Sequence, residues 1–258
     1  MNVIGIQFDI AWENKRANFE TVHRLVTEAR PEKDSLVVLP EMFATGFSMN
    51  ADAIAEPYDD ETEQFLAKTA QDFGICIIAG AAMRSRDGHT RNKALVFSPE
   101  GKLIAYYAKM KPFTVGGEHN HYTAGERVTV FDFGGWRISP FICFDLRFPE
   151  LFRQAAAQGR PELFVVIASW PEKRIQHWIP MLQSRAIENQ AYVVAVNRIG
   201  NDPYYSYNGR SMIIDPHGNI LADAESREGV IQSKLDLVTL RKYREGLPFL
   251  DDLGGLHG

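Results

Sequence analysis

The chain has 258 residues, of which 45% are hydrophobic and 24% are charged, and its net charge is −5 at pH 7. These proportions are typical of a folded globular protein and exclude a disordered chain. The acidic balance, without any run rich in lysine and arginine, excludes nucleic acid as a partner, and no apolar stretch reaches the roughly 20 residues needed to span a membrane.

The two cysteines and the first residues of the chain predict the compartment. Cys76 and Cys143 have no CxxC spacing, and disulfide frameworks are uncommon in chains of this length, so a reducing compartment, the cytoplasm, is predicted. Residues 1–10 are apolar, but they lack a basic start and already include Asp9. They predict a first strand rather than a signal peptide.

The first half of the chain alternates strand-like apolar runs with segments of helical spacing. In chain order, the pattern predicts a strand at residues 3–8, a helix at 14–30, a strand at 35–39, a helix at 60–73 and a strand at 75–82. Two hairpins are predicted next, one from strands 92–98 and 102–108 around a Pro-Glu-Gly turn, the other from strands 128–133 and 136–142 around a Gly-Gly turn.

The second half of the chain continues the same alternation. It predicts a helix at residues 149–158, a strand at 163–168, a helix at 176–190, a strand at 192–197, a hairpin of strands 207–215 and 219–223, a strand at 229–235 and a short helix at 237–244. No linker or charge block divides the chain, so one domain over residues 1–258 is predicted, with a short C-terminal tail from about 237 to 258. Strands that alternate with helices and hairpins favour mixed sheets covered by helices, which is an α/β layered sandwich.

Three polar residues directly follow predicted strands. Glu41 comes after the strand at 35–39, Lys109 after the strand at 102–108, and Cys143 after the strand at 136–142. In α/β folds, ligands bind at the carboxyl ends of strands because the loops there surround a rigid crevice. A carboxylate, a cation and a thiol in such positions form a candidate catalytic set. Taken singly, each residue fits a structural role as well, and a buried cysteine is commonly just a small hydrophobe.

This set of residues suits the hydrolysis of an amide. A thiolate attacks the carbonyl carbon and divides the reaction into acylation and deacylation. Because a free thiol is only slightly ionised at neutral pH, a nearby cation would help to form the nucleophile. The carboxylate can pass the thiol proton to the departing ammonia and then activate water, while the lysine and the backbone N–H of Phe144 bind the oxyanion.

Three sequence blocks carry a resemblance to a known family. LVVLPEMFATGF around Glu41, YYAKMKPF around Lys109 and FICFDLRFPE around Cys143 resemble, in this order, the signature blocks of the nitrilase, or carbon–nitrogen hydrolase, superfamily. The resemblance runs from residue 3 to about residue 249, which is nearly the whole chain. One block alone is moderately specific, whereas all three in order are highly specific.

The resemblance implies a fold, a mechanism and an assembly. The fold would be a four-layer α-β-β-α sandwich with two mixed β-sheets, dimerised through the helical face after the cysteine, with neither metal nor organic cofactor. By position, Glu41 matches the general base, Lys109 the oxyanion lysine and Cys143 the nucleophile. Glu118 matches a second glutamate that orients the lysine and the substrate. Many members have histidine two residues after the lysine, where this chain has Lys111, so Lys111 is the alternative to Lys109.

The blocks LPEMFATGF, GEHNHYTAG and CFDLRFPE are most similar to the omega-amidase branch of the superfamily. The resemblance implies release of ammonia from the terminal amide of 2-oxoglutaramate or 2-oxosuccinamate. Such a 2-oxo acid amide carries a carboxylate, and Arg147 is the candidate cation for it, although Arg147 is equally able to pair with Asp145 or Glu150. Further candidates for substrate binding are Phe43, Phe113, His121, Phe144 and Trp170.

Other interpretations of the same residues compete with the omega-amidase hypothesis. The superfamily also includes amidases for deaminated glutathione, N-carbamoyl compounds and nitriles, and a non-catalytic dimeric binding protein could share the fold. A cysteine redox protein lacks a resolving cysteine near Cys143. A metal site at Glu118, His119 and His121 is disfavoured because no third histidine or cysteine is nearby.

Two further groups of residues receive structural interpretations. Cys76 lies within the apolar segment ICIIAG and is predicted to belong to the core. Tyr204, Tyr205 and Tyr207 are predicted to form a loop at the edge of the pocket or a dimer contact.

Overall fold

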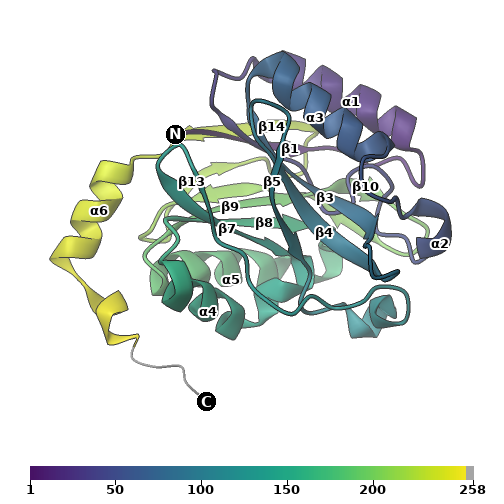
Figure 1. Cartoon of the computed structure of the whole chain (residues 1–258). Coiled ribbons are helices and arrows are strands. Elements are labelled where there is room, and N and C mark those ends of the chain that lie inside the picture. Colours follow the sequence, from purple (N-terminus) through teal and green to yellow (C-terminus); the bar gives the residue numbers. More distant parts are fainter. Residues whose placement is uncertain (254–258) are drawn as a thin grey trace.

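The computed structural model describes residues 1–253, in which two β-sheets pack face to face between two layers of helices (Figure 1). The predicted four-layer α-β-β-α sandwich with two mixed sheets is therefore confirmed. Residues 254–258, the end of the predicted tail, lie outside the described residues.

The first sheet contains six strands in the order β14-β1-β2-β3-β4-β5. β1, β2 and β3 run parallel, and the remaining pairs are antiparallel. The strand bounds are β1 (Asn2–Gln7), β2 (Leu36–Val38), β3 (Cys76–Arg84), β4 (Thr90–Phe97), β5 (Leu103–Ala108) and β14 (Gly229–Lys234).

The second sheet also contains six strands, in the order β13-β12-β9-β8-β7-β6, with β7, β8 and β9 parallel. Their bounds are β6 (Phe131–Phe133), β7 (Trp136–Ile142), β8 (Leu163–Ala168), β9 (Tyr192–Asn197), β12 (Met212–Ile214) and β13 (Ile220–Asp223). A separate two-stranded hairpin joins β10 (Ile199–Asn201) to β11 (Ser206–Asn208).

Side-chain alternation along the strands explains the four layers. In β2, Leu36 and Val38 join the core between the two sheets, whereas Val37 points to the core under the helices. Two helices, α1 (Lys15–Ala29) and α3 (Glu61–Phe73), cover the outer face of the first sheet. The second sheet is covered by α4 (Pro149–Gly159) and α5 (Ile175–Glu188) (Figure 1). Because successive residues of a strand face opposite sides, an uninterrupted apolar strand is buried on both faces.

The remaining helices are short or peripheral. They are α2 (Ala51–Ile54), α6 (Leu237–Gly246) and the 3₁₀ helices η1 (Thr114–Gly116), η2 (Glu118–Asn120), η3 (Cys143–Arg147), η4 (Glu172–Arg174) and η5 (Phe249–Asp252). α2 and the five 3₁₀ helices were not predicted from the sequence. Single turns of helix have too few residues to show a hydrophobic period.

The strand predicted at residues 207–215 is wrong as a single element. It is divided between β11 and β12, because Gly209 and Arg210 adopt φ values of 72° and 62°. A Cβ on Gly209 would lie 2.3 Å from the side chain of Gln7, so this left-handed bend requires glycine for space as well as for φ. The bend separates the β10–β11 hairpin from the second sheet.

Candidate active site

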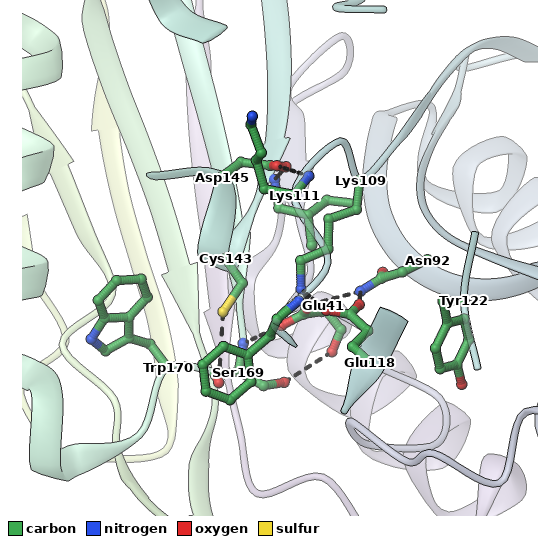
Figure 2. A network of polar contacts seen from close by, with 12 residues as sticks. Glu41, Asn92, Lys109, Lys111, Glu118, Tyr122, Cys143, Asp145, Ser169 and Trp170 are labelled. Carbon is green, nitrogen blue, oxygen red and sulfur yellow. Dashed lines mark hydrogen bonds and ion pairs between the residues drawn. The ribbon is translucent and has the colours of Figure 1, made fainter. Parts of the chain in front are cut away.

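Three strands from the two sheets end at one place inside the sandwich (Figure 2). Glu41 follows β2 after two further residues, Lys109 follows β5 directly, and Cys143 follows β7 directly. All three side chains are buried, with exposed fractions of 0%, 2% and 9% respectively. The sequence prediction that a carboxylate, an ammonium and a thiol meet at strand ends thus agrees with the geometry.

Lys109 lies between two carboxylates. Its Nζ donates hydrogen bonds of 2.8 Å to Glu41 Oε1 and 2.8 Å to Glu118 Oε2. Burial alone would lower the pKa of Lys109, but the negative charges of Glu118 and Glu41 outweigh burial and raise the pKa above its ordinary value. An ammonium has three donors, so one N–H remains for a further acceptor. The lysine is a fixed positive charge in a site from which water is largely excluded.

Asn92 completes a closed network with these residues. Its Nδ2 donates hydrogen bonds of 2.7 Å to Glu41 Oε1 and 2.9 Å to Glu118 Oε1 (Figure 2). The backbone N–H of Phe113 also donates to Glu118 Oε2, at 2.5 Å. Each glutamate therefore accepts hydrogen bonds from at least two donors, and donors from separate elements fix both side chains in position.

The backbone at Glu41 passes unusually close to β3. A Cβ on Gly80 would lie 2.6 Å from the Cα of Glu41 and 2.6 Å from the N of Met42, so only glycine fits there. The next residue, Met42, has φ 46°. Glu41 Oε2 accepts a 2.8 Å hydrogen bond from the backbone N–H of Ser169, directly after β8. This bond connects the two sheets at the site.

Cys143 occupies a strained turn between β7 and η3. Its φ of 47° is unusual for a residue with a side chain, and strain of this kind is typical of functional positions held by the surrounding structure. Sγ lies 3.8 Å from the carbonyl oxygen of Ser169, whose N–H binds Glu41. The thiol and the carboxylate thus both contact the backbone of Ser169.

The pKa of the Cys143 thiol lies well above its ordinary value. Burial is the main cause and the negative charge of Glu41 the next, while Lys109 acts in the opposite direction with a smaller effect. Lys109 lowers the pKa of the thiol, as expected of a cation that helps to form the nucleophile, but burial and two carboxylates outweigh its effect. The resting thiol is protonated, and its proton must be removed as the sulfur attacks.

The two cysteines are expected to differ in reactivity. Cys76 is fully buried in β3, and burial raises the pKa of its thiol to about 12. Iodoacetamide, itself a small amide, is expected to alkylate Cys143 more than about 10-fold faster than Cys76, because thiol reactivity depends on access. Peptide mass spectrometry over time gives the alkylation rate of each cysteine. Cys76→Ala is the control, because it removes the slower reaction. Equal rates would argue against Cys143 as an accessible nucleophile.

Asp145 fastens the cysteine turn to the lysine strand. Its carboxylate accepts from the hydroxyl of Tyr107 at 2.9 Å, from the N–H of Ile142 at 3.0 Å and from the N–H of Lys111 at 2.9 Å. Burial raises the pKa of Asp145 to about 7, against the opposing effects of Lys109 and these hydrogen bonds. The contacts to both strand ends make Asp145 a positioning residue for the site.

The pKa of Asp145 predicts a pH-dependent stability. A folded-state value of about 7 lies above the ordinary value of about 3.9, so its favourable contribution is complete below about pH 4 and is lost as the pH rises through 7. The unfolding free energy of the wild type, relative to Asp145→Asn, is expected to fall between pH 4 and 7 by roughly 1 kcal/mol per pH unit. Urea denaturation at several pH values measures it. Parallel pH curves for the two proteins would contradict the expectation.

A small cavity of about 20 Å³ opens beside Cys143. It is lined by Phe47, Phe113, Cys143, Phe144, Arg147, Ser169, Trp170, Pro171, Arg174, Tyr205 and Tyr207. Four of the predicted substrate-binding residues are thus in its wall, namely Phe113, Phe144, Arg147 and Trp170. A wider open groove of about 1270 Å³ runs beside β5, but none of the three strand-end residues lines it, so the chemistry belongs to the smaller cavity.

Two predicted pocket residues lie elsewhere. Phe43 is fully buried among Phe19 and Phe65, in the core under the helices, because the chain reverses at Met42. His121 is exposed and does not line the cavity. The predictions of these two residues as pocket walls are therefore wrong.

Lys109 and Lys111, the two candidates for the oxyanion lysine, lie in different surroundings. The Nζ of Lys111 lies 4.0 Å from Glu150 at the surface, and its side chain is 38% exposed. It contacts neither Glu41 nor Glu118 within ion-pair distance. Lys109 is the lysine that the fold brings to the carboxylates.

Several site residues were missed from the sequence. Ser169 directly follows the apolar run of β8, so the strand-end signal that selected the other three residues would have selected it. Asn92 and Asp145 carry no such signal, because their roles come from contacts between segments far apart in the chain. Arg174 lies in a short 3₁₀ helix without any pattern of its own.

Within residues 1–253, no cluster of three or more His, Cys, Asp or Glu side chains is arranged to hold a metal ion. Both cysteines are free. None of the helices in the described part of the chain combines the length and the apolar character that crossing a membrane requires.

Comparisons with known proteins agree with this geometry. Residues 4–245 match the family described as carbon–nitrogen hydrolase. The chain is 38% identical to omega-amidase YafV of Yersinia enterocolitica, over 96% of this chain and 94% of that protein. It is 34% identical to 2-oxoglutaramate amidase of Bacillus subtilis, over 96% and 95% of the two chains. The crystal structure of XC1258 from Xanthomonas campestris, a CN-hydrolase superfamily protein with an arsenic adduct in its active site, has a TM-score of 0.92 and 32% identity, covering 98% of this chain and 96% of that one.

Proposed function

The chain belongs to the carbon–nitrogen hydrolase family, and we propose that it is an omega-amidase that releases ammonia from the terminal amide of a 2-oxo acid such as 2-oxoglutaramate. The observation that carries the proposal is the buried Lys109, held by two glutamates next to the thiol of Cys143. Similarity to an omega-amidase and to a 2-oxoglutaramate amidase over almost the whole chain supports the substrate class.

In the acylation step, Cys143 is the nucleophile and Glu41 the general base. The thiol proton moves to Glu41 as Sγ attacks the amide carbon, which fits a thiol that is protonated at rest. The carbonyl oxygen gains negative charge in this step. Two N–H groups of Lys109 bind the glutamates, and the third is available to donate to this oxygen. The N–H of Phe144, in the first turn of η3, is a second donor without an intrahelical partner.

Collapse of the tetrahedral intermediate breaks the carbon–nitrogen bond. Glu41 returns its proton to the leaving nitrogen, so ammonia departs and a thioester on Cys143 remains. In deacylation, Glu41 takes a proton from water, the resulting hydroxide attacks the thioester, and the sulfur leaves with that proton. The products are a carboxylic acid and the free enzyme. Throughout, Glu118 keeps Lys109 in place and neutralises its charge together with Glu41.

The finer aspects of the proposal concern assembly and compartment. One catalytic domain over residues 1–258 is proposed to form a homodimer. Exposed apolar side chains in α5, in β13 and directly after α6 support this: Ile187, Leu221 and Leu247 are 47%, 46% and 51% exposed. A cytoplasmic location is proposed because both cysteines are unpaired and the mechanism needs a reduced thiol. Sedimentation at several concentrations tests the dimer.

The experiment that tests the function is a substrate panel ranked by kcat/KM. The panel contains 2-oxoglutaramate, 2-oxosuccinamate, deaminated glutathione, an N-carbamoyl amino acid and a nitrile, with ammonia release as the readout. The proposal expects the two 2-oxo acid amides to rank first. A first place for deaminated glutathione or the carbamoyl compound would keep the mechanism and reject the omega-amidase assignment. No turnover of any member would reject the hydrolase.

A further inference from the structure

Two arginines line the cavity beside Cys143 without an acidic partner. Arg147 ends η3 and Arg174 ends η4, and both are half-buried. Among residues 1–253, no Asp or Glu oxygen lies within 4.0 Å of either guanidinium. Neither Asp145 nor Glu150, the two partners that the sequence offers to Arg147, forms an ion pair with it. Asp145 is occupied by Tyr107 and two backbone N–H groups.

Aromatic rings, rather than carboxylates, contact both guanidinium groups. The Cζ of Arg147 lies 4.6 Å from the ring centre of Trp170, and the Cζ of Arg174 lies 5.1 Å from that of Phe113 and 5.7 Å from that of Tyr205. Contact with a ring face supports the planar cation while its N–H groups, which lie in the plane, stay available. Arg147 Nη2 also lies 3.3 Å from His177 Nδ1.

The two cations face the same small space, which is unfavourable while it holds no anion. Burial lowers the pKa of Arg147, and the charge of Arg174 lowers it further. Like charges that share a partly desolvated cavity repel each other. A bound carboxylate removes this repulsion and accepts hydrogen bonds from both guanidinium groups.

We propose that Arg174 is a specificity-determining residue which, together with Arg147, binds the carboxylate end of the substrate while the amide end lies at Cys143. The inference rests on the proposed amide hydrolysis and names what the cavity selects. A 2-oxo acid presents a carboxylate and a neighbouring keto oxygen, and two guanidinium forks match such an array of acceptors better than one.

The size of the cavity supports mobile arginine side chains. About 20 Å³ holds a water molecule but not a five-carbon amide, so wall side chains must move when substrate enters. Arg174 is the longest side chain in the wall together with Arg147, and no ion pair within the described residues fixes it.

The test compares a carboxylated amide with a neutral amide of the same chain length. The kcat/KM ratio of 2-oxoglutaramate to pentanamide is expected to fall about 100-fold in Arg174→Gln, the loss typical of truncating one member of a buried charge pair. Arg174→Lys, which keeps the charge without the fork, is expected to recover part of the ratio. Lys173→Gln is the matched control, since it removes one charge from an exposed neighbour that does not line the cavity, and the ratio should not change.

Failure of this inference is distinguishable from failure of the proposed function. An unchanged ratio in Arg174→Gln, with active enzyme, overturns the role of Arg174 and leaves the amidase intact. If the wild type hydrolyses neither compound, binding of 2-oxoglutarate to Cys143→Ala, measured by calorimetry, decides the question without any turnover. Binding that weakens about 100-fold when Arg174→Gln is added supports the inference, and equal binding refutes it.

Discussion

Cys143→Ala is expected to lower kcat for ammonia release from 2-oxoglutaramate by at least about 10⁴-fold. The substitution removes the thiol that lies beside Glu41 and Lys109, so no thioester can form. The remaining carboxylate and ammonium can still polarise water and the amide, which leaves a small residual rate. Continuous detection of ammonia under saturating substrate measures the change.

The control for this experiment is already present in the chain. Cys76→Ala makes the same chemical deletion in β3, where the thiol is fully buried in the core between the sheets. It is expected to lower stability by about 1 kcal/mol, as a small core truncation does, without a loss of kcat on the scale of Cys143→Ala. Substantial hydrolysis by correctly folded Cys143→Ala would remove the nucleophile from the proposed mechanism.

The sequence predicted the parts of the site that depend on strand ends. Glu41, Lys109 and Cys143 each follow an apolar run, and the ends of such runs meet when the sheets pack. The family resemblance added Glu118, which follows no strand. The layered fold was predictable for a similar reason, because strand and helix periods are local properties of the chain.

The parts that escaped prediction depend on side-chain direction and on contacts between segments distant in the chain. Phe43 is only two residues from Glu41, yet the positive φ of Met42 turns its ring toward the helix-side core. Asn92 lies at the beginning of an apolar strand run, and nothing in that run reveals that its amide bridges two glutamates. Arg174 acts through its length and its ring contacts, which no residue spacing encodes.

The electrostatics of the site show why one cation is indispensable. Glu41 and Glu118 have no exposed surface, and Lys109 is the only cation that donates to both in the described chain. Asn92 contributes two hydrogen bonds but no charge. The network therefore contains two negative charges and one positive charge, and the protonated thiol adds none.

Lys109→Met should therefore damage both activity and stability. Removing one member of a buried ion pair leaves the other without compensation, which costs about 3–5 kcal/mol of unfolding free energy. The loss of an oxyanion donor is expected to lower kcat of the folded fraction of this variant by about 10²- to 10³-fold. Lys111→Met is the matched control. Its side chain is 38% exposed, and its one ion pair, with Glu150, is long at 4.0 Å. The unfolding free energy is therefore expected to change by less than about 0.5 kcal/mol, with near-normal turnover.

A double variant separates uncompensated charge from lost packing as the cause of that destabilisation. Adding Glu118→Gln to Lys109→Met removes one of the two carboxylates while keeping the shape of its side chain. If uncompensated charge is the cause, the double variant is more stable than Lys109→Met alone, and the coupling free energy in a double-mutant cycle is well above 0.5 kcal/mol. If the losses simply add, the lysine contributes by packing, for example against Phe47, whose ring centre is 5.1 Å from Nζ. The same cycle measured through kcat asks whether Glu118 acts only by holding Lys109, since a pure positioning residue has little further effect once the lysine is gone.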